Sequence, residues 1–339
     1  MTALAITELL GDGIGPELRE SVHTVAASLP LDVAFEPVDL SLEARRREPG
    51  AAYDRVVASL ARSKLGLKYP TVTAEESPNA VLRTRLGLSV IHRPVHSIPG
   101  ITSSFKENVT LDIVRVATGG TYDDPGQRIG PDVAVSLRIV ERRPCTEAAR
   151  FAFQFARRNG LSVTSSSKHT IQRATDGFFE AIVREVAAEF PDVPHSVELF
   201  DALLAKICLR PREFAVVLTL NEYGDFLSDM ACGLIGSMGL GASGSYSFAK
   251  SGEIDVALFD PAGGTAPDIA GLGVCNPTAA LLAFALLLEH AQHGALARAL
   301  RSAILGEIAG GKTTRDVGGA LGTAEFTARV CDALESRIP

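Results

Sequence analysis

The sequence lacks most of the features that would assign it directly to a common class of protein. Its 33 Lys and Arg residues are outnumbered by 40 Asp and Glu residues, which gives a net charge of −7. A nucleic-acid-binding protein needs an excess of positive charge to meet phosphates, so nucleic acid is not an expected partner. The short basic triplet at residues 45–47 does not change this, and we expect it on a solvated helix face.

Long hydrophobic runs are absent as well. The most apolar stretch, residues 279–288, is far too short to span a bilayer and predicts a buried helix. The N-terminus has no basic segment of the signal-peptide type. The five cysteines are scattered without a CxxC pair, which is typical of reduced thiols in a cytosolic protein. We therefore expect a cytoplasmic protein with no membrane partner.

What the sequence does contain is an ordinary globular composition with alternating strand-like and helix-like patterns. Hydrophobic residues make up 46% of the chain, which is enough for one large domain or two lobes. The alternation favours an α/β architecture. Thr146 is the predicted cap of one helix, Gly160 is its predicted left-handed end, and residues 118–131 are expected to form a loop or an arm. Strands are predicted at 5–10, 161–164, 197–200, 215–220 and 255–259, and helices at 16–28, 146–158, 171–189 and 279–288.

Two carboxylates in the segment NEYGDFLSD are candidates for a metal site. Asp225 and Asp229 lie four residues apart, so a helix would place them on one face, where their like charges repel. A divalent cation such as Mg²⁺ or Mn²⁺ would relieve this repulsion. The alternative is a solvated helix face, since Asp is favourable near a helix N-terminus. The apolar neighbours Phe226 and Leu227 favour a buried helix over a solvated one.

Two glycine-rich segments follow predicted strands. GDGIG at residues 11–15 does not match the dinucleotide-binding pattern, because Pro16 takes the place of its last glycine, so a tight turn is the better interpretation. GGTAPDIAG at residues 263–271 has the small side chains that a close approach to a nucleotide requires. Asp268 in this segment could accept hydrogen bonds from an adenosine ribose and would repel a 2′-phosphate. A plain structural turn explains the segment equally well.

Three arginines are candidates for binding an anionic ligand. Arg83, Arg93 and Arg115 stand near predicted strand or helix ends, with Ser77 and Asn79 just upstream. Convergent arginines bind carboxylates through two parallel hydrogen bonds. Isolated arginines are usually surface residues, so this cluster is informative only if the fold brings it together.

The motifs occur in one characteristic order along essentially the whole chain. They are GDGIGPE, S-x-N-x-x-LR, RPV, GG-x-Y, a lysine after a strand, N-x-Y-GD-x-x-SD and GTAPDIAG-x-G-x-x-NPTA. Together they resemble the isocitrate and 3-isopropylmalate dehydrogenases, the β-decarboxylating dehydrogenases. The resemblance implies a two-lobed α/β fold with a mixed sheet, which is not a standard Rossmann fold. Residues 1–95 and 238–339 would form the large, cofactor-binding lobe, and residues 96–237 the small lobe with the dimer interface and a clasp arm.

The resemblance also implies a reaction. A homodimer would bind NAD, Mg²⁺ or Mn²⁺ and a small polyanionic 2-hydroxy acid, which it would oxidise and decarboxylate in active sites shared between subunits. Lys168 from the neighbouring subunit would act as the base on the 2-hydroxyl, and Tyr122 would reprotonate the enolate. The implied metal ligands are Asp225, Asp229 and the neighbouring subunit's Asp201. The implied substrate-binding residues are Ser77, Asn79, Arg83, Arg93 and Arg115, and the implied cofactor-binding residues are Asn221, Gly264, Thr265, Ala266, Asp268, Ile269 and Asn276.

Two local features bear on specificity within this resemblance. Ser77 and Asn79 are similar to the pair with which isocitrate dehydrogenases bind the γ-carboxylate, whereas isopropylmalate enzymes have apolar residues there. An isocitrate-like substrate with a polar or anionic γ-group is therefore expected. The pair Asp268-Ile269 resembles the NAD-using branch of the family.

Several departures from the family's usual residues leave the substrate open. Gly263 stands where a histidine is usual, and Thr170 where an asparagine is usual. His92 and His96 flank Arg93 and suggest a specialised relative that acts on a phosphonate analogue such as 3-(phosphonomethyl)malate. Isopropylmalate, D-malate and tartrate are further alternatives. A non-catalytic regulatory subunit is the alternative from another class, and the presence of every implied catalytic and metal residue argues against it.

Overall fold

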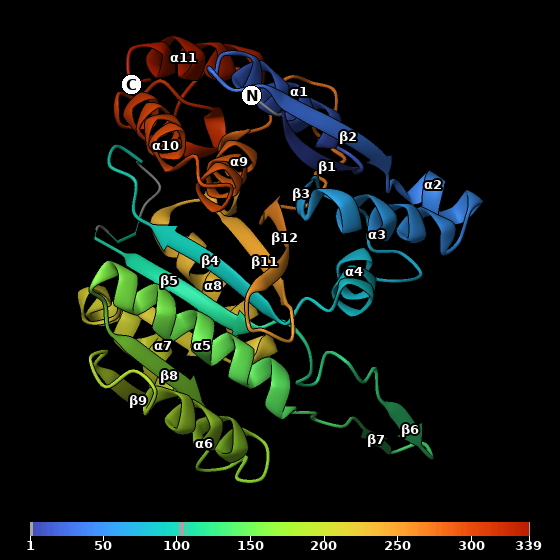
Figure 1. Cartoon of the computed structure of the whole chain (residues 1–339), viewed down its shortest axis with the longest axis vertical. Coiled ribbons are helices and arrows are strands. Elements are labelled where there is room, and N and C mark those ends of the chain that lie inside the picture. Colours follow the sequence, from blue (N-terminus) through green and yellow to red (C-terminus); the bar gives the residue numbers. More distant parts are fainter. Residues whose placement is uncertain (1–2, 102–104, 107, 339) are drawn as a thin grey trace.

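A single mixed sheet runs through the molecule (Figure 1). The computed structural model describes residues 3–101, 105–106 and 108–338. Within them the sheet has ten strands, in the spatial order β2 (Val33–Asp39), β1 (Leu4–Leu10), β3 (Leu65–Lys68), β12 (Ile254–Pro261), β11 (Ala242–Phe248), β4 (Val90–His96), β5 (Thr110–Val116), β10 (Val216–Thr219), β8 (Val163–Ser167) and β9 (His195–Leu199).

The strand directions divide the sheet into three parts. From β2 to β12 all neighbours are parallel, and from β5 to β9 they are parallel again. Between these parts, β11 is antiparallel to β12 and β4, and β4 is antiparallel to β5. Parallel neighbours need crossover connections, which helices supply here. The predicted α/β fold with a mixed sheet is confirmed.

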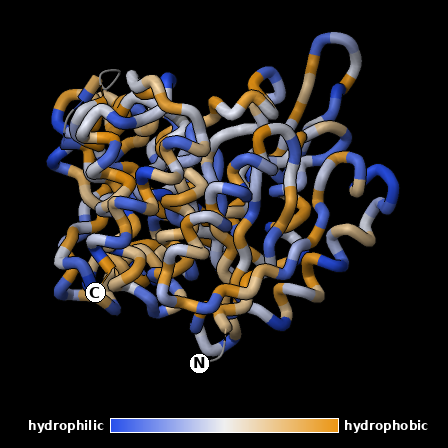
Figure 2. Tube along the Cα trace, turned by 90° about the horizontal axis from the view of Figure 1, so that it is seen from above, coloured by the Kyte–Doolittle hydropathy of each residue, from blue (hydrophilic) through white to orange (hydrophobic). Residues whose placement is uncertain are grey.

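Helices cover both faces of the sheet. They are α1 (Gly15–Ala27), α2 (Leu42–Arg47), α3 (Ala51–Ser63), α4 (Pro78–Leu86), α5 (Arg142–Asn159), α6 (Asp176–Ala187), α7 (Phe200–Leu209), α8 (Asn221–Ile235), α9 (Thr278–His290), α10 (Gly294–Ala309) and α11 (Thr323–Glu335), with short 3₁₀ turns η1 (Pro211–Glu213), η2 (Met238–Leu240) and η3 (Arg315–Val317). Helices α5 and α8 pack on opposite faces of β4 and β5 (Figure 1). Hydrophobic stretches concentrate in the body of the molecule (Figure 2).

The expected division into two lobes follows the sheet. Strands from both ends of the chain lie on the β2 side and include β4, whereas β5, β10, β8 and β9 come from the segment 96–237. Because β4 pairs with β5 along its whole length, the sheet is continuous across the expected boundary. The division into a large lobe of residues 1–95 and 238–339 and a small lobe of residues 96–237 stays a prediction.

Two predicted helix starts are wrong. Helix α5 begins at Arg142, and the Thr146 hydroxyl inside it donates to the Arg142 carbonyl at 2.8 Å and caps nothing. Its predicted end is confirmed, because Gly160 is left-handed with φ of 65°. Helix α6 begins at Asp176, five residues later than residue 171, because the Asp176 carboxylate holds the preceding turn by accepting the backbone N–H of Lys168 at 2.7 Å.

The basic triplet is also partly misassigned. Arg45 in α2 is buried and not solvated. Its guanidinium donates to the carbonyls of Leu40 at 3.1 Å and Val72 at 2.7 Å, so it ties two loops together. Only its neighbours Arg46 and Arg47 are solvent-facing.

Two short strands form an arm that projects from the body. Strands β6 (Gln127–Ile129) and β7 (Val133–Val135) pair in an antiparallel hairpin (Figure 1). Its apolar side chains Ile129, Val133 and Leu137 are more than half exposed. All five cysteines of the chain are free thiols. Among the helices that the structure describes, none combines the length and apolarity that crossing a bilayer requires.

Candidate active site

Helix α8 lies close enough to β5 to bring carboxylates and arginines together. Gly224 makes this approach possible, because a Cβ at that position would clash with the side chain of Arg115. Asp225 follows directly and accepts hydrogen bonds from the Arg115 guanidinium and, at 3.1 Å, from the Tyr122 hydroxyl. Arg115 also donates to Oδ1 of Asn221 at 2.8 Å. One turn of helix thus joins four of the predicted site residues.

The second carboxylate has an arginine of its own. Arg93 on β4 donates to Asp229 at 3.2 Å and to the Ser228 hydroxyl at 2.7 Å. Asp225 and Asp229 remain 36% and 49% exposed, so neither interpretation of the pair is excluded by burial. Phe226, expected to help bury this helix, is 56% exposed, whereas Leu227 is fully buried. The helix is therefore buried on one side only.

A cavity of about 390 Å³ unites the predicted substrate residues. It is lined by Ser77, Asn79, Arg83, Arg93, Arg115, Tyr122, Asn221, Asp225 and Asp229, with Ala80, Thr84, Ala117, Thr118, Asp123 and Ala262. An adjoining cavity of about 220 Å³ shares Asn79, Arg83 and Arg93 with it. We call them the large and the small cavity. The small one extends to Lys68, Asp260 and the loop residues Gly263 and Gly264, and its charged residues Lys68 and Asp260 were not found by sequence reasoning.

Several arginine donors in the large cavity have no hydrogen-bond acceptor. Within the described residues, the Arg83 guanidinium forms no hydrogen bond or ion pair. Burial and the charge of Arg115 lower the pKa of Arg83 to about 10, so it remains a cation at neutral pH. Nε of Arg93 and Nε of Arg115 are buried and have no acceptor. A small polyanion would supply the acceptors that these donors lack.

The acidic groups of the cavity are held in opposite protonation states. Burial alone would raise the pKa of Asp225, but the neighbouring Arg115 and Arg93 charges and the Tyr122 hydroxyl bring it below its usual range. Burial and the Asp225 charge raise the pKa of Tyr122 to about 12. At neutral pH, Asp225 is therefore an anion beside a phenol that keeps its proton.

Ser77, which was predicted to bind substrate, also stabilises the start of a helix. It is the N-cap of α4, and its hydroxyl accepts the backbone N–H of Ala80 at 3.4 Å. Its own proton is left for a ligand. Asn79 in the first turn is exposed. Both residues reach the large cavity because this cap holds the start of α4 at its edge.

Among the predicted catalytic and metal-binding residues, two lie outside the large cavity. The Lys168 ammonium donates to Asp201 at 2.6 Å, and neither side chain lines either cavity. Among the described residues, no group of three His, Cys, Asp or Glu could hold a metal ion. Asp225 and Asp229 offer the oxygen ligands that Mg²⁺ and Mn²⁺ prefer. In this chain Asp225 and Asp229 are paired with Arg115 and Arg93, and the assignment of Asp201, Asp225 and Asp229 to a metal ion stays a prediction.

The predicted cofactor residues fall in two places. The loop at 263–276 is hydrogen-bonded to the start of α1. The Thr265 carbonyl accepts the N–H of Ile14 at 2.9 Å. The Glu17 carboxylate accepts the N–H groups of Gly271 at 2.9 Å and Gly273 at 2.8 Å. Asn276 closes the loop by donating to Asp316 at 3.0 Å. Gly264 lines the small cavity, and Gly264 and Asp268 are exposed, whereas Thr265, Ala266 and Ile269 are partly covered. Asn221 lies apart from this loop, beside Arg115, and the assignment of all these residues to a cofactor stays a prediction.

The histidines beside Arg93 do not face the cavity. Successive residues of a strand point to opposite sides, so His92 and His96 lie on the α5 side of β4. His92 contacts Asp112 at 2.8 Å, and His96 contacts the same carboxylate at 3.5 Å. His92 also packs against the ring of Phe155. The expectation of a substrate pocket with extra histidines is wrong.

The large cavity combines three arginines and three carboxylates with a protonated phenol, beside the switch in strand direction of a mixed sheet, and such a site is suited to a small charged ligand. Comparison with known proteins then identifies the family. Residues 5–331 match the model of the isocitrate/isopropylmalate dehydrogenase family. The chain belongs to this family, and it is an oxidoreductase of the β-decarboxylating type.

Individual relatives agree with this assignment. The chain is 35% identical to the catalytic subunit 5 of the mitochondrial NAD isocitrate dehydrogenase of Arabidopsis thaliana, over 98% of this chain and 89% of the relative. It is 33% identical to the 3-isopropylmalate dehydrogenase of Methanothermobacter thermautotrophicus, over 99% and 100%. The crystal structure of the isocitrate dehydrogenase from Methylococcus capsulatus superimposes with a TM-score of 0.88 at 32% identity, covering 98% of this chain and 99% of that one. Identities this similar do not decide between the two substrates.

Proposed function

We propose that the chain is an NAD-dependent enzyme that requires a divalent metal ion and oxidises and decarboxylates a substituted malate with a polar or anionic γ-group, as in isocitrate. One observation carries the proposal: the large cavity brings Ser77 and Asn79 together with the three arginines, Asp225 and Asp229. An apolar γ-group would leave the polar side chains of Ser77 and Asn79 without partners, which disfavours isopropylmalate.

The residues of the chain have distinct tasks in this proposal. Arg83, Arg93 and Arg115 bind the substrate carboxylates through donors that are free in the structure. Mg²⁺ or Mn²⁺ on Asp225 and Asp229 would stabilise negative charge on the substrate oxygens. Tyr122 carries a proton at neutral pH and is placed beside Asp225 to deliver it to the carbon that loses CO₂.

Lys168 and Asp201 require a second chain in this proposal. Lys168 is the base for the 2-hydroxyl, yet it lies outside the large cavity of its own chain. We therefore propose a homodimer in which each chain contributes Lys168 and Asp201 to the site of its partner. The exposed apolar side chains of the arm around Ile129 and Val133 are a surface that such a partner would cover.

Mixing two inactive variants tests the shared site. Lys168→Ala and Asp225→Asn are each expected to be inactive alone, but a mixed dimer has one site free of both defects. Coexpression should therefore restore about a quarter of the wild-type activity if the chains pair at random. No recovery in a mixture proven to contain mixed dimers would show that Lys168 acts in its own chain.

The substrate is tested by a panel assay on the purified chain. Isocitrate, isopropylmalate, D-malate, tartrate and 3-(phosphonomethyl)malate are compared with NAD and Mn²⁺, with EDTA and NADP as controls. We expect isocitrate to have the highest kcat/KM, no turnover with EDTA, and a preference for NAD, because the exposed Asp268 carboxylate would repel a 2′-phosphate. A kcat/KM for isopropylmalate above that for isocitrate would refute the substrate class.

The alternative functions have less support. The histidines that suggested a phosphonate substrate lie on the α5 side of β4, so they no longer support that substrate. A regulatory subunit is disfavoured because Tyr122, Lys168, Asp201, Asp225 and Asp229 are all present. Absence of NADH formation with every substrate of the panel would favour the regulatory reading. A cytoplasmic location is a separate proposal, which fractionation of cells that produce the protein would test.

A further inference from the structure

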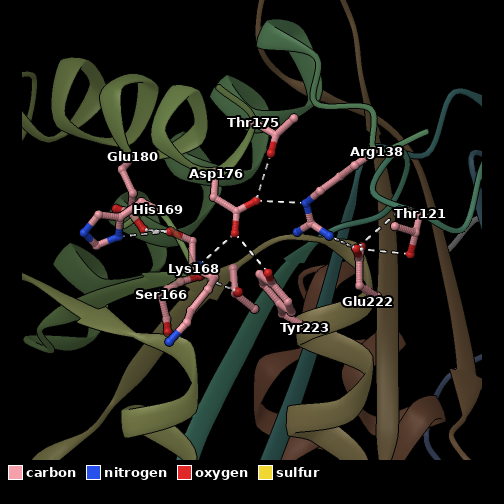
Figure 3. A network of polar contacts seen from close by, with 12 residues as sticks. Thr121, Arg138, Ser166, Lys168, His169, Thr175, Asp176, Glu180, Glu222 and Tyr223 are labelled. Carbon is pink, nitrogen blue, oxygen red and sulfur yellow. Dashed lines mark hydrogen bonds and ion pairs between the residues drawn. The ribbon is translucent and has the colours of Figure 1, made fainter. Parts of the chain in front are cut away.

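A buried set of charged residues lies beside the candidate active site and is not explained by substrate binding (Figure 3). At its centre, Nε of Arg138 donates to Oδ1 of Asp176 at 2.9 Å, and Nη1 of Arg138 donates to Oε1 of Glu222. The side chains of Arg138, Asp176 and Glu222 are 13%, 0% and 5% exposed. We call these three residues the Arg138 network.

The Asp176 end of the network fixes the backbone at Lys168. Oδ2 of Asp176 accepts the backbone N–H of Lys168 at 2.7 Å and the Tyr223 hydroxyl at 3.0 Å. The Arg138 guanidinium also stacks over the Tyr223 ring, 4.7 Å from its centre. The backbone of Lys168 is therefore connected through Asp176 to Tyr223 of α8, whereas the Lys168 ammonium binds Asp201.

The Glu222 end fixes the segment that carries Tyr122. Oε1 of Glu222 accepts both the backbone N–H and the hydroxyl of Thr121 at 3.3 Å. Gly120 is packed against the same carboxylate so closely that a Cβ there would overlap Oε2, and its φ is +70°. The residue directly after Thr121 is Tyr122, so its backbone is held to the first turn of α8.

Arg138 itself stands at the base of the arm. The two legs of the arm meet where Gly120 donates to the Ile139 carbonyl at 2.6 Å and Ile139 donates back at 2.9 Å. Arg138 precedes Ile139, and its side chain reaches from this junction to both carboxylates. Because the guanidinium is planar and its donors lie on separate nitrogens, Nε and Nη1 each bind one carboxylate, whereas a lysine has all its donors on one nitrogen.

We infer that Arg138 is a positioning residue, which holds the backbones of Lys168 and of the Tyr122 segment against α8, so that Tyr122 lies beside Asp225 and Lys168 is presented to the site of the partner. The inference rests on the proposed function, since that proposal assigns Lys168 and Tyr122 to the reaction. Arg138 touches neither cavity. Its effect on turnover is therefore exerted through the groups it places.

The test combines kinetics with amide hydrogen exchange on the full-length protein. Arg138→Lys keeps the charge but replaces the two separate nitrogens that bind Asp176 and Glu222 by one. Glu222→Gln is the second variant. It keeps the shape of the side chain and removes its charge, and it is used if Arg138→Lys folds poorly. Arg142→Lys is the matched control, because Arg142 pairs with Glu185 on the surface and both side chains are more than half exposed.

For Arg138→Lys we expect kcat to fall about 100-fold, since a shift of about 1 Å in a reacting group has that effect. KM should stay within about threefold, because the cavity donors are untouched. The amides of Thr121 and Lys168 should exchange about tenfold faster than in the wild type. Arg142→Lys should change none of these quantities, and Glu222→Gln should affect Thr121 more than Lys168.

The two readouts separate this inference from the proposed function. Unchanged exchange at Thr121 and Lys168 in both Arg138→Lys and Glu222→Gln would overturn the positioning role. Faster exchange with wild-type kcat would overturn its link to turnover. If the wild-type protein turned over no substrate of the panel while exchange rose as expected, the proposed function alone would fall.

Discussion

Glu222 and Asp225 lie three residues apart on α8, and the regions around them show how one kind of chemistry serves two purposes. Around Glu222, the Arg138 network is almost free of solvent and its carboxylates bind backbone groups and a guanidinium of the same chain. Around Asp225, the carboxylates of Asp225 and Asp229 are 36% and 49% exposed and line the large cavity. Charges sealed from water hold the fold, and charges at a cavity are left to bind a ligand.

The largest expected effect is on turnover and comes from Lys168, whose side chain is 33% exposed. Lys168→Ala should lower kcat by about 1,000-fold, the range in which a positioned acid–base group contributes. The free energy of unfolding should hardly change, because the bond from the Lys168 backbone to Asp176 is kept. Steady-state kinetics and urea unfolding measure the two effects.

Lys206→Ala is the control for this variant. Lys206 forms a pair with Glu198 at 2.6 Å and is 34% exposed, which matches the 33% exposure of Lys168. Its removal should leave turnover unchanged. Near-normal activity of Lys168→Ala would remove that lysine from the mechanism.

The next effect is on stability, from the buried region. Asp176→Asn should lower the free energy of unfolding by about 3 kcal/mol, because it leaves the buried Arg138 with a weakened partner. Equilibrium urea unfolding gives this value. Asp201→Asn, in an exposed carboxylate, should cause no measurable loss. Equal losses in both variants would contradict the distinction between the two regions.

A smaller effect concerns specificity in the large cavity. Asn79→Ala should lower kcat/KM for isocitrate by about 10- to 100-fold, since a hydrogen bond to a charged group is lost. D-malate has no γ-substituent, so its kcat/KM should not change and serves as the control. The same loss for both substrates would show that Asn79 does not bind the γ-group.

The smallest effect is a dependence of stability on pH. The pKa of Asp225 is lower in the folded protein than the value of about 3.9 expected when unfolded, so its ionised form stabilises the fold. This contribution is complete above about pH 4 and is lost as pH falls through the folded pKa. Solvent screening limits it to about 1 kcal/mol.

Asp225→Asn makes this contribution measurable. The difference in unfolding free energy between wild type and Asp225→Asn should be largest at neutral pH and shrink as the pH falls below about 4, because the carboxyl is then progressively protonated. Urea unfolding at several pH values records it. A difference that stays constant with pH would show that the charge of Asp225 does not stabilise the fold.

Much of the site was predictable because short motifs place their own residues. The spacing of Asp225 and Asp229 puts them on one side of a helix without reference to the rest of the chain. The S-x-N-x-x-LR motif likewise forms a helix start with Ser77 as its cap, and Arg83 follows about one turn after Asn79. Local spacing and hydrogen bonding decide these features, so the sequence alone reveals them.

Other features depend on which distant segments meet. His92 and Arg93 are neighbours in sequence, but the pleat of β4 sends one to Phe155 and the other to Asp229. The partner of Arg138 could not be read from its surroundings, because Glu222 lies 84 residues further along the chain. In isolation, Glu222 is simply a polar residue in the first turn of a helix.

The sequence by itself indicated the family, the α/β class and the arginines, Asp225, Asp229 and Tyr122 of the large cavity, since each rests on local motifs and their order. Only the tertiary structure decided which of those charges are open to a ligand, that His92 and Arg93 face opposite sides of the sheet, and that Arg138 joins Asp176 to Glu222. Burial and long-range packing set these outcomes, and neither is encoded in the spacing of any single segment.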